Sequence, residues 1–238
     1  MCGRFVSALP PEELARIFAI AGPLPNAAPT WNLAPTQSAV VVRRNPETGE
    51  RALSLLRWGL FPSFAKDPKA TRPFNARAET VATNGMFRGA FAKRRCLVPA
   101  DAYYEWHATP AGKIPYAIAG ADGLPLALAG IWEGHRAPDG EITRSFAIVT
   151  TAANTALAHL HPRMPLVVAH ADWPAWLGEA EADATQLLRA APEAALKAWR
   201  IGTAVNSVRN NTPELLWPAT PQAGDTLSPP EASGTLTL

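Results

Sequence analysis

The chain has 238 residues, of which 47% are hydrophobic and 18% are charged, and its formal net charge is +2. This composition is typical of a globular protein and excludes a disordered chain. A net charge so close to zero does not by itself indicate a nucleic-acid-binding protein. The two cysteines can form at most one pair, which excludes a disulfide scaffold. The sequence contains no run of 18 apolar residues and no signal-peptide pattern, so we expect a cytoplasmic protein without a membrane span.

Most of the predicted elements are short strands. Residues 10–22 predict a first helix, because prolines open the segment, glutamates lie at its positively charged end and a glycine closes it. SAVVVRR and RALSLLRW, separated by NPETGE, predict a β-hairpin over residues 38–58. Further strands, bounded by Gly, Pro or Asp, are expected over residues 96–106, 114–120, 124–134 and 144–152.

Towards the C-terminus, the sequence predicts short helices over residues 171–178, 183–191 and 192–199, and a late strand over residues 201–209. Strands with irregularly placed helices and no βαβ rhythm favour an α+β fold, in which a mainly antiparallel sheet forms an open barrel-like core with peripheral short helices. We expect residues 1–217 to form one domain. Residues 218–238 are poor in apolar side chains and rich in turn formers, and are predicted to be a disordered tail.

The common signatures of catalytic and nucleotide-binding sites are absent from the sequence. GxSxG, HExxH, GxxxxGK[ST], GxGxxG and CxxC do not occur. His159 and His161 form an HxH pair, but nothing nearby completes a zinc set. We therefore expect neither a metal nor a cofactor.

Cys2 is the candidate nucleophile because of its position. Removal of the initiator methionine, which is usual before a small residue, leaves a free α-amine beside the thiol. The pKa of an α-amine is about 7.7–8.0 against about 10.4 for lysine, so part of it is neutral near neutral pH. A neutral amine adds to an aldehyde to give an imine. The thiol can then close a five-membered thiazolidine ring. The plain alternative is an incidental cysteine at a frayed terminus.

Eight strings carry a family resemblance. They are MCGRF, WNLAPTQ, RWGLFPSF, RPFNARAET, RCLVPADAYYEW, AGIWE, HPRMP and VNSVRNNTPEL. In this order, from residue 1 to about residue 217, they closely resemble the SOS response-associated peptidase family, which is also known for shielding abasic sites. The resemblance implies a β-rich open barrel whose cysteine lies on the floor of a basic groove that takes single-stranded DNA.

The resemblance also implies four catalytic residues, which are Cys2, Asn75, Glu105 and His161. A carboxyl facing inward from the apolar strand AYYEW would have a raised pKa and could move protons. Asn75 could hydrogen-bond the Cys2 amine and the sugar hydroxyls, and His161 could assist opening of the abasic sugar. Each of these three residues also has a plain alternative. Glu105 could be a solvent-facing strand residue, Asn75 a turn residue and His161 a structural loop histidine.

Five further residues are candidates for contact with DNA. Arg4, Arg77 and Arg163 each lie within two residues of a proposed catalytic group, and we expect them to grip phosphates. Trp58 and Phe61, in RWGLFPSF, could stack on exposed bases. Alternatively, the three arginines lie on a solvated face and bind no phosphate, and the two aromatic side chains pack in the core.

Together these patterns predict an enzyme that recognises abasic sites in single-stranded DNA and forms a covalent thiazolidine crosslink through Cys2. We expect it to act as a monomer and to be associated with the nucleoid when bound to DNA. Two alternatives stay open. One is a thiol peptidase with an N-terminal nucleophile, acting on the residue that precedes Cys2. The other is a non-covalent reader of modified bases.

Overall fold

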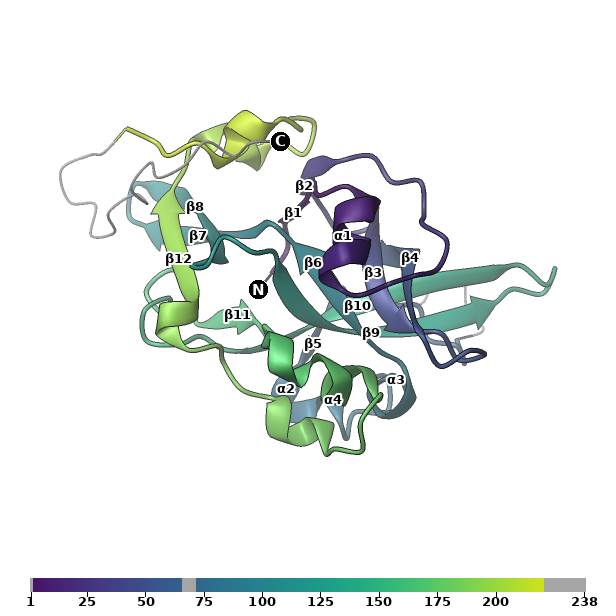
Figure 1. Cartoon of the computed structure of the whole chain (residues 1–238). Coiled ribbons are helices and arrows are strands. Elements are labelled where there is room, and N and C mark those ends of the chain that lie inside the picture. Colours follow the sequence, from purple (N-terminus) through teal and green to yellow (C-terminus); the bar gives the residue numbers. More distant parts are fainter. Residues whose placement is uncertain (1, 66–71, 221–238) are drawn as a thin grey trace.

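Two β-sheets make up most of the fold in the computed structural model, which describes residues 2–65 and 72–220 (Figure 1). Sheet A is antiparallel throughout. Its strand order is β12 (Leu196–Arg200), β8 (Gly112–Gly120), β7 (Ala102–Thr109), β1 (Phe5–Ser7) and β2 (Thr30–Leu33). The N-terminal strand β1 therefore lies inside a sheet, between β7 and β2.

Sheet B closes into a ring. The ring runs through β10 (Ile142–Ala152), β4 (Arg51–Trp58), β3 (Ser38–Arg44), β6 (Arg95–Ala100) and β9 (Leu126–Arg136), and β9 pairs again with β10. The β10–β4 pair is parallel and the other pairs of the ring are antiparallel. Two short strands, β5 (Asn75–Arg77) and β11 (Arg163–Pro165), pair with β10 as well. This arrangement confirms the predicted α+β fold with a mainly antiparallel, barrel-like core.

The strands of the ring are apolar on both faces, because each face packs in a different core. In β3, Val40 and Val42 pack in a cluster with helix residues such as Leu14 and Trp176, whereas Val41 packs in a second cluster with Cys2. Successive side chains of a strand point to opposite faces, so the uninterrupted apolar run in SAVVVRR is the pattern of a strand buried on both sides.

Short helices cover one side of the ring. They are α1 (Pro11–Ile17), α2 (Ala78–Val81), α3 (Arg88–Lys93) and α4 (Trp173–Leu177), with 3-10 turns at His170–Asp172, Ala184–Leu187, Glu193–Ala195, Thr203–Asn206 and Pro213–Leu216. In Figure 1, α2, α3 and α4 lie together below the ring, and β7, β8 and β12 of sheet A lie to the left. Within the described residues, no helix is long and apolar enough to cross a membrane.

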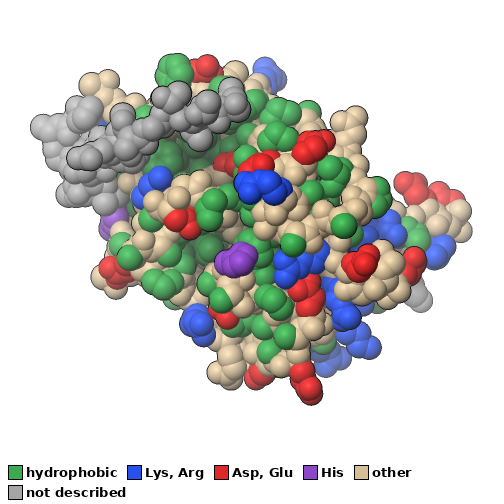
Figure 2. Space-filling view, in the orientation of Figure 1, with side chains coloured by type: hydrophobic (Ala, Val, Ile, Leu, Met, Phe, Trp, Pro, Cys, Tyr) green, Lys and Arg blue, Asp and Glu red, His purple; other side chains and the backbone are tan. Residues whose placement is uncertain are grey.

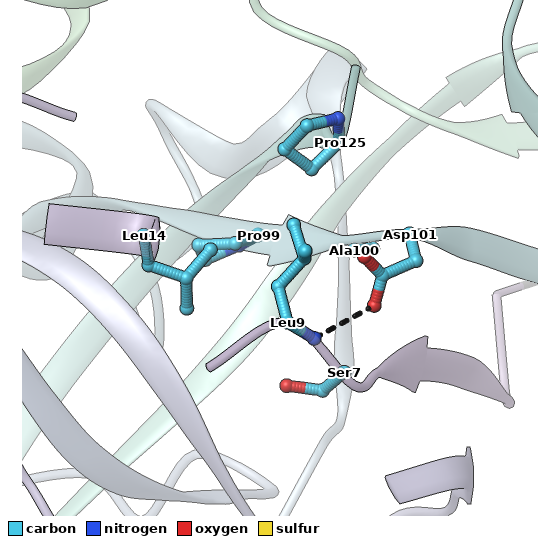
Figure 3. A pocket seen from close by; sticks show the side chains of 7 residues that line it. All are labelled: Ser7, Leu9, Leu14, Pro99, Ala100, Asp101 and Pro125. Atoms are coloured by element: carbon cyan, nitrogen blue, oxygen red, sulfur yellow. Dashed lines mark hydrogen bonds between the residues drawn. The ribbon is translucent and has the colours of Figure 1, made fainter. Parts of the chain in front are cut away.

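Asp101 ties the segment after β1 to the junction between β6 and β7 (Figure 3). Its Oδ2 accepts a hydrogen bond from the backbone N–H of Ala8 at 2.7 Å. It also accepts one from the backbone N–H of Leu9 at 3.4 Å, which Figure 3 shows. The Asp101 N–H donates to the carbonyl of Val6 at 3.0 Å. These bonds hold the exit of β1 in place, and with it the strand that follows residue 2.

The hairpin predicted over residues 38–58 is confirmed, with Ser38 opposite Arg57 and Arg44 opposite Arg51. The first helix is shorter than predicted and ends at Ile17. Phe18 is fully buried and stacks on Trp173 at 4.4 Å between ring centroids. The chain then turns through Ala19, whose φ of 53° is incompatible with a continuing helix.

Three predictions for the C-terminal part are wrong. Residues 183–191 form only the 3-10 turn Ala184–Leu187, and the helix predicted over 192–199 is replaced by the edge strand β12, which pairs with β8. The open edge of β8 outweighs the helix propensity of an alanine-rich segment. Residues 201–209 are not a strand, because the side-chain amide of Asn32 binds the carbonyls of Val205, Ser207 and Asn210.

Most of the predicted tail lies outside the described residues. Its first residues do have a partner, since Pro218 bridges to Ile201 and the N–H of Ala219 donates to the carbonyl of Arg200 at 3.0 Å.

Gly130 of β9 tests how tightly the ring is packed. A Cβ at this position would lie 2.7 Å from Cys96 Sγ and 3.1 Å from Val98 Cγ2. We expect Gly130→Ala to destabilise the protein by about 1–3 kcal/mol, the usual cost of overpacking a core. The measurement is urea unfolding, with Gly202→Ala as the control because a Cβ there meets nothing within 4 Å. Equal stability of the two variants would contradict the packing described for β6 and β9.

Candidate functional site

Cys2 is held rigidly although it stands almost at the chain terminus. Its side chain is 0% exposed. Asn75 Nδ2 donates a hydrogen bond to the Cys2 carbonyl at 2.8 Å, and the backbone N–H of Arg4 lies near the Cys2 thiol. Asn75 is itself fixed because it opens β5, opposite Ile148 of β10. The first strand and β5 thus meet at residue 2.

Burial raises the pKa of the Cys2 thiol, and the nearby Glu105 carboxyl raises it further, while the positive charge of the N-terminus and the backbone N–H of Arg4 oppose the shift. The thiol is therefore protonated at neutral pH. A proton must leave the sulfur before or while it forms a bond, which requires a base close by.

Glu105 is the nearby carboxyl. It lies on β7 and is only 6% exposed. Burial raises the pKa of Glu105 above its ordinary value, and the electrostatic interaction with His161 opposes this shift. A carboxyl with a raised pKa keeps its proton to a higher pH and can exchange it with neighbouring groups. The sequence-based expectation of an inward-facing carboxyl in AYYEW is thus matched by its burial.

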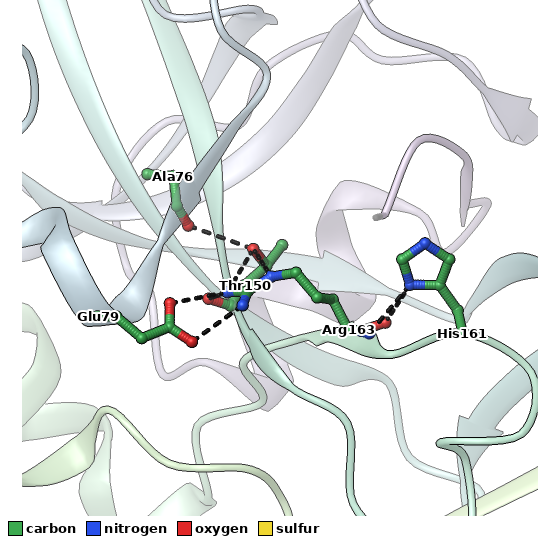
Figure 4. Close-up of polar contacts among 5 residues, drawn as sticks. All are labelled: Ala76, Glu79, Thr150, His161 and Arg163. Carbon is green, nitrogen blue, oxygen red and sulfur yellow. Dashed lines mark hydrogen bonds and ion pairs between the residues drawn. The ribbon is translucent and has the colours of Figure 1, made fainter.

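His161 has a hydrogen-bond partner in both protonation states. Its Nδ1 lies 3.0 Å from the backbone nitrogen and 3.0 Å from the carbonyl oxygen of Arg163 (Figure 4). In the neutral ring Nδ1 can accept from the Arg163 N–H, which leaves the proton on Nε2; in the charged ring Nδ1 can donate to the Arg163 carbonyl. The imidazole can therefore exchange a proton at Nε2 without losing its anchor.

The carboxyl and the imidazole share a small cavity. It has about 170 Å³ of empty space, solvent at its mouth included. It is lined by Tyr103, Glu105, Ile118, Leu157, Leu160, His161, Arg163 and Met164. Tyr103 is a site residue that the sequence patterns did not indicate. The signal was available, since residues two apart on a strand share a face and Tyr103 precedes Glu105 by two.

Asn75 also offers an acceptor to the site. Its Oδ1 is buried, and among the residues described by the structure it has no hydrogen-bond partner. An amide held by one bond to the Cys2 carbonyl can present this oxygen to an N–H or O–H that enters the site.

Arg163 is engaged within the protein (Figure 4). Its guanidinium forms a two-pronged ion pair with Glu79 at 2.9 and 3.0 Å, and it donates to the Thr150 carbonyl at 2.6 Å. Thr150 Oγ1 lies 3.3 Å from Arg163 Nε and 3.5 Å from the Ala76 carbonyl. The sequence did not indicate the Glu79 partner. A phosphate bound to Arg163 would have to share this guanidinium with Glu79.

The other two candidate arginines differ from each other. Arg77 is exposed at the end of β5. Arg4 is partly buried, and its Nη1 donates to Asn32 Oδ1 at 2.7 Å and to the Val205 carbonyl at 3.0 Å. The contacts of Arg4 hold the chain next to Cys2, whereas Arg77 is directed to solvent.

The two candidate aromatic side chains lie in the core. Trp58 is 0% exposed, and its Nε1 donates to the Phe74 carbonyl at 2.8 Å. Phe61 is 5% exposed, and it packs against His135 at 4.1 Å between ring centroids. This placement corrects the expectation that they stack on bases, because rings that are 0% and 5% exposed offer almost no surface to a base. Phe64, in the same segment, is 65% exposed.

The charged side chains of the visible face are mixed in sign. Figure 2 shows basic and acidic groups interspersed among apolar ones, with basic groups gathered towards the lower right. Within the described ranges 2–65 and 72–220, no group of three or more His, Cys, Asp or Glu side chains is placed to hold a metal ion.

The fold and the site together define a class of protein, in which a closed β-ring and an adjoining sheet bury a cysteine at the start of the chain beside a carboxyl and an imidazole. The sequence pattern of the family described as SOS response associated peptidase (SRAP) matches residues 1–208. The chain belongs to this family.

Two relatives align with most of this chain. Abasic site processing protein YoqW of Bacillus subtilis is 33% identical over 223 residues, which is 91% of this chain and 99% of that protein. Abasic site processing protein HMCES of Gallus gallus is 32% identical over 224 residues, which is 80% of this chain and 66% of that protein.

Solved structures share the fold. A crystal structure of a Bacteroides thetaiotaomicron protein has a TM-score of 0.83 at 22% identity and covers 92% of this chain and 100% of its own. A Bordetella bronchiseptica protein has a TM-score of 0.73 at 27% identity and covers 84% and 100%.

The raised pKa of Glu105 predicts a pH-dependent loss of stability. The folded protein keeps the Glu105 proton to a higher pH than the unfolded chain, so this group destabilises the fold as pH rises from the unfolded pKa to the folded pKa. We expect the free energy of unfolding of Glu105→Gln, minus that of the parent, to increase over this interval and then to level off. Urea unfolding at a series of pH values measures it.

The control is Glu141→Gln, which alters an exposed carboxyl outside the site. Cys2 and His161 face Glu105, so the comparison is made with both unchanged. A difference that is flat or decreasing for Glu105→Gln would contradict the burial of its carboxyl.

Proposed function

We propose that this protein captures abasic sites in single-stranded DNA by forming a thiazolidine with the amine and thiol of Cys2. The observation that carries the proposal is the placement of residue 2. The one residue whose α-amine and thiol can both react with an aldehyde is buried beside a carboxyl of raised pKa and bonded to Asn75. The names of the relatives, which are abasic site processing proteins, support the same substrate.

The proposed reaction needs no cofactor and no change of oxidation state. The neutral amine of Cys2 adds to the aldehyde carbon of the opened sugar, and the resulting hydroxyl leaves as water, giving an imine. The thiol sulfur then bonds to the same carbon, and its proton leaves through a neighbouring base. One water is released for each ring formed. The product is a covalent link between protein and DNA.

Each neighbouring side chain has a role in this scheme. Glu105 supplies the proton for the departing water and receives the proton of the thiol. His161 exchanges a proton at Nε2 and assists opening of the abasic sugar to its aldehyde. Asn75 fixes the Cys2 carbonyl and offers Oδ1 to the amine. We propose a monomer as the acting unit and single-stranded DNA as the partner.

The peptidase alternative is less well supported. A thiol protease needs a thiolate, which a nearby positive charge normally stabilises. Here burial and the Glu105 carboxyl both raise the pKa of the Cys2 thiol. A neutral thiol that loses its proton only as the ring closes is compatible with these surroundings.

The proposal predicts that the active protein begins at Cys2, because an acylated nitrogen cannot form the imine. Intact mass should be lower than that of the full translation by one methionine. Cys2→Ala should abolish the heat-stable crosslink to abasic single-stranded DNA on a denaturing gel, while an imine trapped by borohydride remains possible through its amine. Cys96→Ala, which removes the other buried cysteine, is the matched control. Crosslinking by Cys2→Ala at the parental level would refute the thiazolidine.

The proposed DNA contact predicts a steep salt dependence of binding. Each phosphate contact to a single strand contributes about −0.7 to the slope of log K against log salt. We expect Arg77→Ala and Arg163→Ala each to flatten this slope by about one unit or less. Arg16→Ala, which changes an exposed arginine of α1 paired with Glu13, should leave it unchanged. Parental slopes in both site variants would remove Arg77 and Arg163 from the DNA contacts.

A further inference from the structure

Tyr103 is a buried phenol that lies beside Cys2 and lines the site cavity. Its side chain is 1% exposed. It lies on β7, on the same face as Glu105, and lines the same cavity as Glu105 and His161. Among the residues that the structure describes, the Tyr103 hydroxyl has no hydrogen bond, and it is not one of the fully enclosed atoms without a partner, so it keeps some surface at the cavity.

The next residue shows the usual arrangement. Tyr104 points to the opposite face of β7, and its hydroxyl donates to the Trp31 carbonyl at 2.8 Å. Buried tyrosines normally find such a partner, because an unpaired buried hydroxyl is destabilising. The two tyrosines are equally buried, at 1% and 0% exposure, so their difference lies in what their hydroxyls face.

The Tyr103 hydroxyl faces the reacting groups. It interacts electrostatically with both the Cys2 thiol and the Glu105 carboxyl. Burial, with these two acidic neighbours, raises the pKa of Tyr103 well above its ordinary value. The phenol therefore keeps its proton and can act only as a hydrogen-bond donor or a neutral acceptor while Cys2 and Glu105 exchange protons.

We propose that Tyr103 is a further catalytic residue, whose hydroxyl donates a hydrogen bond to the oxygen on the aldehyde carbon while Cys2 attacks that carbon. This inference rests on the proposed function. The amine nitrogen bonds to the carbon, the carbon–oxygen double bond becomes a single bond, and the proton lost by nitrogen is taken by oxygen. Negative charge develops on this oxygen, and a donor fixed in a buried site stabilises it.

The remaining steps leave Tyr103 unchanged. Glu105 gives a proton to the hydroxyl, the carbon–oxygen bond breaks and water leaves, which produces a protonated imine. The Cys2 sulfur bonds to the carbon, the carbon–nitrogen double bond becomes single, and the thiol proton returns to Glu105. Tyr103 holds the oxygen until it departs and neither loses nor gains a proton.

The test compares Tyr103→Phe with Tyr104→Phe. Each removes one hydroxyl from a buried ring of the same strand, but only Tyr103 lies at the cavity. The measurement is a single-turnover time course of crosslinking to abasic single-stranded DNA, paired with equilibrium binding to the intact strand at the same salt concentration. Removing one such donor typically slows an enzyme by about 10²–10³-fold.

We expect Tyr103→Phe to crosslink at least about tenfold more slowly, with a dissociation constant within about twofold of the parent. Tyr104→Phe should crosslink at the parental rate but unfold at a lower urea concentration, because it loses its bond to Trp31. The pH profile of the rate should keep its midpoint in Tyr103→Phe, since the phenol does not act by changing the titration of Glu105.

A parental rate in Tyr103→Phe would overturn this inference while leaving the proposed function intact. A shifted midpoint of the pH profile would also overturn it, because it would mean that Tyr103 acts through Glu105. A parent protein that forms no heat-stable crosslink would overturn the proposed function, and this inference with it.

Discussion

The site depends on the immobilisation of the first residues of the chain. Chain termini are usually poorly ordered unless something ties them down. Here β1 pairs on both edges, with β7 and β2, and Asn75 bonds the Cys2 carbonyl. Arg4 adds side-chain bonds to Asn32 and Val205, which connect the first strand to the C-terminal part of the fold. Under the proposed function, an amine at residue 2 that is held in place in this way would need no further ordering when an aldehyde arrives.

Strand β10 brings the other site residues to this terminus. Its residues Ile148 and Thr150 pair with Asn75 and Arg77 of β5, and its end pairs with β11, which begins at Arg163. His161 precedes β11 by two residues and is therefore carried to the same place. Sheet A supplies the remaining group, because β7 lies directly beside β1 and bears Glu105. Two sheets thus converge where the chain begins.

Burial destabilises the ionised forms of the Cys2 thiol and the Glu105 carboxyl, which are the groups that exchange protons in the proposed reaction. Burial raises the pKa of both the Cys2 thiol and the Glu105 carboxyl, and the carboxyl raises that of the thiol further, so the charged forms are disfavoured at the site. Such an environment disfavours a free thiolate, and it is compatible with the proposed reaction, in which protons pass between neutral groups. The short chain of bonds from Thr150 through Arg163 to Glu79 keeps the neighbouring β11 and α2 in position around it.

The local sequence pattern by itself determined the strand period and the hairpin over residues 38–58. Together with the strings that resemble the family, it also indicated the candidates Cys2, Asn75, Glu105 and His161. These follow from residue type and short spacing, which neighbours along the chain define. The burial of Trp58 and Phe61, the strand β12 and the place of Tyr103 were decided by tertiary structure. So was the Arg163–Glu79 pair, whose members are 84 positions apart. Which face is covered, which sheet edge is open and which charge is paired depend on side chains distant in sequence, and no local pattern contains them.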